Sequence, residues 1–190
     1  MESLIKSRLL ESTEVKRLLA ESEEVEKIKA VAEAIAEALR RGNKVVLFGN
    51  GGSAADAQHI ACEFVGKFMK ERKGLPAISL TTNTSCLTAI ANDYSYDIVF
   101  ERQVEAFVQK GDVVIGISTS GKSKSVIRGI IKAKELGALT VGLTGKSGGD
   151  LAKVADICIK VPSELTPRIQ EAHITIGHII SELVENELFK

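Results

Sequence analysis

The chain has 190 residues and a mass of 20.4 kDa, a length that suits one domain with a full hydrophobic core. Lysine plus arginine and aspartate plus glutamate each number 25, so the formal net charge is zero. This balance gives no electrostatic basis for binding nucleic acid or a membrane surface, and no apolar run approaches the roughly 20 residues that a transmembrane helix requires.

The first 41 residues are predicted to be helical, because they are rich in Glu, Lys, Leu and Ala and contain neither Gly nor Pro. Apolar residues recur there at steps of three and four and form one stripe, which consists of Val25, Ile28, Ala32, Ile35 and Leu39. Gly42 and Asn43 end the segment. Its polar, charged start does not resemble a signal peptide, so we expect a soluble cytoplasmic protein.

From residue 45 onward, short apolar runs alternate with helical patterns. The runs predict strands at 45–48, 76–80, 113–117, 139–143 and 156–161. The helical patterns predict helices at 53–69, 83–91, 97–109, 123–136 and 167–188, with a turn at 92–95. Continuously apolar strands alternating with helices are typical of a parallel sheet covered on both faces. We therefore predict a doubly wound α/β fold in a single domain, residues 1–190.

Ligands of such folds bind at the carboxyl edge of the sheet, where the strand order reverses. The first strand is followed there by the glycine-rich segment Gly49–Ser53, which opens a helix and is a natural anion-binding turn. Extended to Ala54, the segment also fits the loose dinucleotide fingerprint G-x-G-x-x-A. That site needs an acidic residue after the second strand, and 79–83 contains none. A nicotinamide site is therefore not expected.

Residues 116–123 match the P-loop pattern G-x-x-x-x-G-K-S. Gly116 lies inside an apolar run, however, whereas the first glycine of a P-loop lies in the loop itself. No other predicted strand ends in the aspartate that would hold magnesium. Nucleotide hydrolysis is therefore not expected, although the serine hydroxyls and loop amides suit a single phosphate ester.

His59 and Glu63 are four residues apart on one predicted helix, a spacing that fits a metal site, an acid/base pair or an ordinary surface hydrogen bond. His178 lies among isoleucines of the last helix, where a histidine is either a satisfied core residue or a functional one. Gln170 lies roughly 80° from His178 around that helix, and spacing alone would favour Glu171 as its partner.

Two further groups carry weaker signals. Asn92 and Asp93 fit a turn, with sugar-hydroxyl binding as the alternative. The three cysteines are far apart, form no C-x-x-C pair and have no histidine arrangement that would make a nucleophile. We expect reduced, buried thiols at Cys62, Cys86 and Cys158.

Taken together, these segments resemble the sugar isomerase (SIS) domain family, and within it the phosphoheptose isomerases. The resemblance spans nearly the whole chain, and the segments that carry it are 49–53, 56–59 with Glu63, 92–93, 116–123, 143–149 and 168–173 with His178. The resemblance implies strand order 2-1-3-4-5 and a homotetramer with active sites where subunits meet. The N-terminal helical segment, with its apolar stripe, would then take part in oligomer packing.

The resemblance further implies conversion of sedoheptulose 7-phosphate into D-glycero-D-manno-heptose 7-phosphate, an early step of heptose biosynthesis. Glu63 would be the base that forms an enediol, and His178 the acid or a metal ligand. One zinc ion per subunit would be held by His59, Glu63, Gln170 and His178. The implied substrate-binding residues are Gly51, Gly52, Ser53, Glu63, Asn92, Asp93, Ser118, Thr119, Ser120, Ser123 and Gln170.

One departure leaves an alternative open. Some isomerases of this family carry an acidic residue just before Arg-Ile-Gln-Glu, where this chain has Thr166 and Pro167. The Thr-Pro form also occurs in a non-catalytic relative that binds the bacterial replication initiator. That relative lacks a histidine at the position of His178, so the presence of His178 favours the enzyme.

Overall fold

The computed structural model describes residues 1–189 and has a five-stranded, all-parallel sheet of order β2-β1-β3-β4-β5. The strands are β1 Val45–Gly49, β2 Ala77–Ser79, β3 Val113–Ile117, β4 Leu139–Thr144 and β5 Ile157–Lys160. The helices are α1 Glu2–Ala20, α2 Glu24–Arg40, α3 Gly52–Val65, α4 Thr84–Asp93, the 3-10 helix η1 Tyr96–Ile98, α5 Val99–Phe107, α6 Lys124–Glu135, α7 Leu151–Val154 and α8 Thr166–Leu188. The predicted fold class and strand order are confirmed, and every strand ends within one residue of its prediction.

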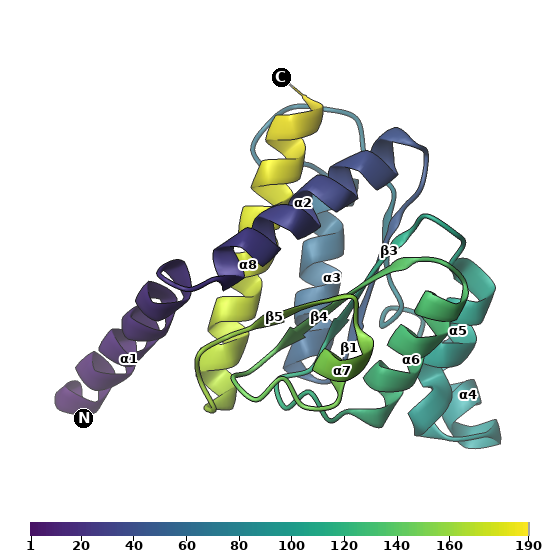
Figure 1. Ribbon diagram of the computed structural model, residues 1–190. Helices are drawn as coiled ribbons and strands as arrows, with labels where there is room; N and C mark the ends of the chain where they lie inside the picture. The colour runs from purple at the N-terminus through teal and green to yellow at the C-terminus, as the bar shows by residue number, and fades with distance from the viewer. Residues whose placement is uncertain (190) are drawn as a thin grey trace.

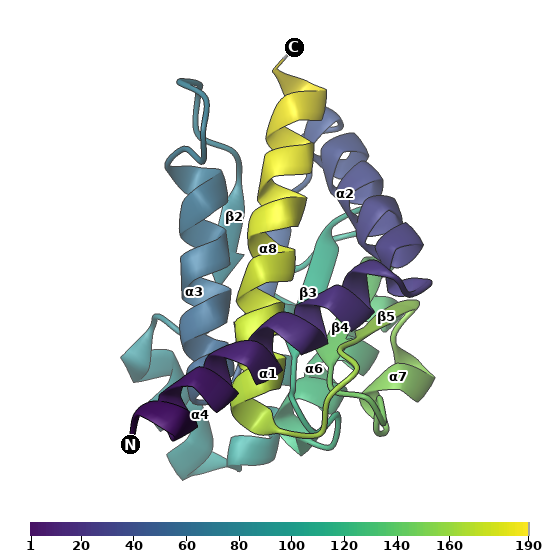
Figure 2. The same cartoon turned by 90° about the vertical axis from the view of Figure 1, so that its left-hand side faces the viewer.

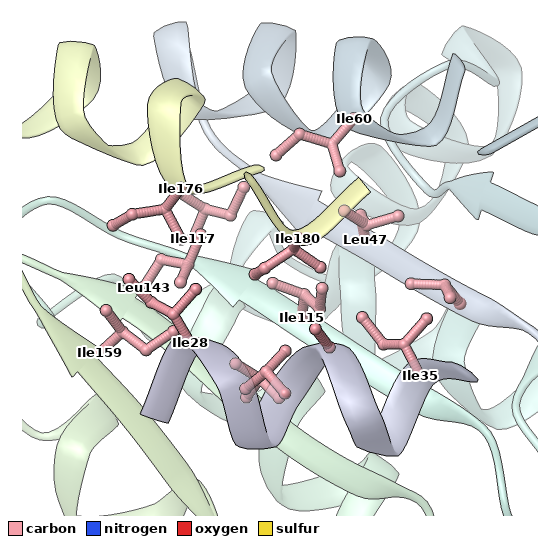
Figure 3. Close-up of a cluster of buried hydrophobic side chains, with 14 of the residues drawn as sticks. Ile28, Ile35, Leu47, Ile60, Ile115, Ile117, Leu143, Ile159, Ile176 and Ile180 are labelled. Atoms are coloured by element: carbon pink, nitrogen blue, oxygen red, sulfur yellow. The ribbon is translucent and has the colours of Figure 1, made fainter. Parts of the chain in front are cut away.

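Two hydrophobic layers cover the sheet, because side chains along each strand point alternately to opposite faces. On one face α2, α3 and α8 pack over side chains that include Leu47, Ile115 and Leu143 (Figure 3). On the other face α5, α6 and α7 cover Val46, Phe48 and Val114, with α4 beside them (Figure 1). The second layer includes the stacked rings of Phe48 and Phe100, whose centroids are 4.9 Å apart.

The N-terminal segment differs from its prediction, because two helices replace the expected continuous one. α1 ends at Ala20 and α2 begins at Glu24. The stripe assigned to oligomer packing is largely buried within the subunit, although Val25 is exposed. It is α1 that extends away from the body (Figure 1) and exposes apolar side chains. These are Leu4, Ile5, Leu9, Leu10 and Leu18.

Helices α3 and α8 lie side by side on the first face (Figure 2). Both start at the carboxyl edge of the sheet, since α3 follows β1 and α8 follows β5. Gly177 allows close contact, because a Cβ placed there would lie 2.4 Å from Cδ1 of Ile60. Side chains of α3 and α8 at the same height therefore meet across a narrow seam.

The edge strand β5 is covered by a side chain of α2. The backbone N–H of Lys160 donates to Oε2 of Glu24 at 3.0 Å, and Glu24 also pairs with Lys27. Glu24 is buried in this position. Within residues 1–189, no helix is both long and apolar enough to cross a membrane.

Smaller differences from prediction concern helix ends. α3 ends at Val65 rather than 69, and the expected turn at Asn92 and Asp93 is wrong, because both form the last turn of α4. The short helix α7 was not predicted.

Candidate functional site

The seam between α3 and α8 brings together two imidazoles and a carboxylate. Nε2 of His59 lies 2.9 Å from Nε2 of His178 and 3.1 Å from Oε1 of Glu63, and His178 Nε2 is 4.0 Å from the same oxygen. His59 and Glu63 share a face of α3 because they are one helical turn apart, and His178 reaches them from α8. Spacing left open whether His59 and Glu63 are a surface pair or a functional site, and the proximity of His178 favours a site.

The donor set of His59, Glu63 and His178 fits a divalent metal. All three ligand atoms lie within 4.8 Å of one another. Bonds of about 2.0–2.1 Å in tetrahedral geometry separate ligand atoms by about 3.3 Å, and the three observed separations bracket that value. Two histidines and a carboxylate leave a fourth position open, as catalytic metal sites do. These residues thus form a candidate metal-binding group.

Gln170 lies nearer the start of the seam than His178. Eight residues separate the two along α8, which is about 12 Å of helical rise. The Gln170 amide lies against Gly52 at the start of α3, where a Cβ on Gly52 would be 2.3 Å from Nε2. The glycine therefore makes room for this amide, and the place of Gln170 among the metal ligands stays a prediction.

The glycine-rich loop is tied to the loop after β3 by a residue that the sequence reasoning missed. Asn50 Nδ2 donates to Ser123 Oγ at 2.8 Å and to Ser125 Oγ at 3.0 Å, and its Oδ1 accepts from the Tyr96 hydroxyl at 2.8 Å. The two loops meet between β1 and β3, where the strand order reverses. Ser123 Oγ also lies 3.3 Å from Ser125 Oγ, so this hydroxyl is held at the junction of the two loops.

The phosphate-binding candidates lie on the loop that follows β3. Ser118 is buried, Thr119 and Ser123 are half-buried, and Ser120 is exposed. Gly121 has a φ of +65° and lies against the loop after β4. A cavity of about 190 Å³ opens beside this loop, and it is lined by Thr119, Ser120, Lys122, Gly145, Lys146, Ser147, Ser163, Glu164 and Ile169. Hydroxyls and two lysine side chains thus surround a space at the carboxyl edge.

The remaining candidates are placed less centrally. Asn92 donates to Asp93 at 2.9 Å, and both are exposed at the end of α4. Glu171, which spacing favoured as the partner of His178, instead pairs with Arg168. Cys62 is exposed, and Cys86 and Cys158 are half-buried, so the expectation of buried thiols is wrong.

The fully buried histidine of the last helix is His173, not His178. Its Nε2 lies 3.1 Å from the backbone oxygen of Thr144, and Nδ1 has no partner within residues 1–189. Burial lowers the pKa of His173 to about 4, so the ring is neutral. His178, expected among apolar residues, is half-buried at the seam.

A carboxyl group one turn before His59 was also missed. Asp56 is half-buried, and its Oδ2 accepts no hydrogen bond from any described residue. Burial raises the pKa of the Asp56 carboxyl, while a nearby His59 lowers it in part. Its place in the first turns of a helix that opens from a glycine-rich loop was the available signal.

Comparison with known proteins gives a consistent picture. The SIS domain family model matches residues 12–145. The chain is 54% identical to the phosphoheptose isomerase of Clostridium acetobutylicum over 190 residues, which is 100% of this chain and 97% of that protein. It is 58% identical to the phosphoheptose isomerase of Aquifex aeolicus, over 95% of this chain and 94% of that one. The solved phosphoheptose isomerase of Neisseria gonorrhoeae superimposes with a TM-score of 0.92 at 40% identity, covering 97% of this chain and 98% of the other.

Proposed function

This chain belongs to the SIS domain family and, within it, to the phosphoheptose isomerases, and from that premise we propose how its residues carry out the reaction. The substrate is sedoheptulose 7-phosphate and the product D-glycero-D-manno-heptose 7-phosphate. The observation that carries the proposal is the meeting of Glu63 with two imidazoles at the α3–α8 seam.

Moving a carbonyl from C2 to C1 requires a base near both carbons. Glu63 removes the proton from C1 of the ketose and returns it to C2, with an enediol between the two steps. Its side chain is 18% exposed and its Oε1 contacts His59, so the carboxylate is held but open on one side. His178, 40% exposed, donates a proton to O2 and accepts one from O1.

We further propose one zinc ion per subunit, which would be held by His59, Glu63 and His178. Gln170 would complete the set only after its amide moves away from Gly52 and along the seam. Zinc would act as a Lewis acid that stabilises negative charge on the enediolate oxygens. Glu63 cannot use one oxygen both as a tight ligand and as a free base. With a metal held by one of its oxygens, Glu63 would act as the base through the second oxygen, or metal binding would modulate activity.

The substrate is bound at two places that match its two ends. The loop after β3, with Ser118, Thr119, Ser120 and Ser123, takes the phosphate, and the start of α3 with Gly51, Gly52 and Ser53 takes the sugar. His59 lies seven residues beyond Gly52, which is about 10 Å along the helix. Phosphate and carbonyl are thus held apart along the extended carbon chain, and Asn92 and Asp93 contact the sugar.

The working assembly is a cytoplasmic homotetramer. The histidines of the site are half open to solvent in one subunit, and an enediol requires water to be kept away. The exposed apolar side chains of α1 give a surface on which a second subunit would complete that cover.

The test is turnover of sedoheptulose 7-phosphate followed by NMR, with and without zinc and a chelator, in the parent and in Glu63→Gln. We expect aldoheptose 7-phosphate from the parent and a loss of at least about 100-fold in kcat for Glu63→Gln, with His178→Ala comparably impaired. Glu105→Gln, an exposed glutamate on the opposite face of the sheet, is the matched control and keeps full activity.

Activity of Glu63→Gln within tenfold of the parent would remove Glu63 as the base. No turnover by the parent under any metal condition would favour the regulator alternative. Binding to the replication initiator would then be measured directly.

A further inference from the structure

The segment 66–76 after α3 has neither helix nor sheet over most of its length, yet it is firmly anchored to α8. The Glu185 carboxylate accepts three consecutive backbone N–H groups, from Phe68 at 3.1 Å, Met69 at 2.7 Å and Lys70 at 2.8 Å. It also accepts from Nε of Arg72 at 2.8 Å. One buried carboxylate therefore anchors residues 68–72 in the middle of the segment.

Arg72 extends this anchor to the end of α3. Its side chain and that of Glu185 are each 2% exposed. Besides Glu185, the guanidinium donates to backbone oxygens at the end of α3 and in the loop, which belong to Glu63, Phe64, Gly66 and Lys73. The last carbonyls of a helix have no partners within it, so Arg72 caps α3. Its contact with the Glu63 carbonyl, at 2.7 Å, reaches the proposed base itself.

The anchored segment carries an aromatic ring to the site. The Phe68 ring centroid lies 5.7 Å from that of His178, with the planes inclined at 30°. His178 and Glu185 are seven residues apart and share a face of α8, so the loop bound at Glu185 reaches back along that face. The His59 ring contacts the same imidazole edge-on, with centroids 5.1 Å apart. Two rings thus limit rotation of the His178 side chain.

We propose that Arg72 and Glu185 form a clamp that makes Phe68 a positioning residue for His178. The clamp fixes the conformation of the loop, and the loop fixes the position of the Phe68 ring. The ring in turn orients the His178 imidazole so that Nε2 points at Glu63 and His59. The inference rests on the proposed function, in which His178 is the acid or a metal ligand. Burial alone would raise the pKa of Glu185, but its amide and Arg72 hydrogen bonds outweigh this and lower it, so the clamp stays ionised.

The primary variant is Phe68→Leu, which keeps an apolar side chain and removes the ring. Phe107→Leu is the matched control, because Phe107 is an exposed phenylalanine at the end of α5 on the other face of the sheet. Arg72→Lys tests the clamp, since lysine keeps the charge and loses the planar fork that reaches the carbonyls. Glu185→Gln is avoided because breaking a buried pair can prevent folding.

Two readouts separate positioning from stability. The chain has three histidines, so histidine-labelled protein gives three ring signals that can be assigned by substitution. We expect Phe68→Leu and Arg72→Lys to shift the ring resonances of His178 and leave those of buried His173 unchanged. We expect kcat to fall about tenfold or more in both variants with KM close to the parent, as for groups that orient a ligand. Phe68→Leu should keep thermal stability close to that of the parent, whereas Arg72→Lys should lower it, because buried carbonyls lose their donors.

The proposal is overturned if the His178 signals of Phe68→Leu coincide with those of the parent and kcat stays within about twofold. It is also overturned if the activity of Phe68→Leu falls only in step with its thermal stability, or if Phe107→Leu loses as much activity as Phe68→Leu. A shift in Phe68→Leu without one in Arg72→Lys refutes the clamp. If the parent has no isomerase activity, the proposed function fails, and the histidine spectra still decide whether the clamp holds the ring.

Discussion

His173 makes the unfolding free energy of this protein depend on pH, and the size of the effect follows from its pKa. The ring is fully buried, its Nε2–H donates to the Thr144 carbonyl, and burial lowers its pKa from the ordinary 6.5 to about 4. In the unfolded chain the same imidazole takes up a proton near pH 6.5. Between these two values the unfolded state binds one proton more, so stability falls as the pH is lowered through this window and is fully retained above it.

The magnitude follows from the difference of about 2.5 pKa units at about 1.36 kcal/mol each, which gives about 3 kcal/mol below pH 4. At pH 4.5 the loss is about 2.5 kcal/mol. The perturbation is His173→Gln, because a glutamine amide can still donate to the Thr144 carbonyl and does not titrate. Any pH-independent loss of stability caused by the substitution is the same at both pH values, so it cancels in the difference between them.

The assay is urea unfolding of parent and variant at pH 7 and pH 4.5, at one protein concentration so that any self-association contributes equally to both. Carboxylates and the other histidines titrate alike in both proteins. The parent should therefore lose about 2.5 kcal/mol more than His173→Gln on acidification. Equal losses in the two proteins would show that His173 is not held neutral by burial, and the reasoning would fail.

Two other predictions concern the phosphate loop and the helix seam. Ser120→Ala should raise KM for the sugar phosphate several-fold with little change in kcat, since its hydroxyl lines the cavity at the carboxyl edge, and an unchanged KM would remove it from the phosphate site. Gly177→Ala should lower the unfolding free energy by about 1–3 kcal/mol, because the new methyl group would overlap the Ile60 side chain at 2.4 Å, and denaturant titration measures it. Adding Ile60→Ala should recover part of that loss. An unchanged unfolding free energy in Gly177→Ala would mean that the seam can accommodate the extra methyl group.

Strands were predicted closely because buried parallel strands are continuous apolar runs bounded by turn residues, as at 113–117. The break between α1 and α2 was missed because Glu21, Ser22 and Glu23 contain no Gly or Pro. The first helix is capped at Glu21 with φ −95° and ψ 1°, and the second begins after Glu23, which has right-handed helical angles, so neither position needs a glycine. α7 is too short to produce a periodic pattern.

In the candidate site, likewise, contacts between residues close in sequence could be predicted, and contacts between distant residues could not. The pairing of His59 with Glu63 follows from their four-residue spacing, which places both on one face of a helix. The contact of His178 with this pair depends on how α8 packs on α3. The family resemblance implied this contact, but the spacing of residues along the chain did not. The Arg72–Glu185 pair joins positions 113 residues apart, each of which is an unremarkable charge in its own stretch of sequence.

The covered edge of β5 has a consequence for how this protein can associate. An edge strand with free N–H groups is a template onto which another chain can add a strand. Repeated strand addition of this kind leads to fibrils. Glu24 occupies one such N–H, that of Lys160, and the opposite edge strand β2 has only three residues. Both edges of the sheet therefore offer little to an added strand, which favours contacts through helices over strand addition. A nascent or damaged chain in which α2 has not docked would expose β5 and become prone to sticking to its neighbours.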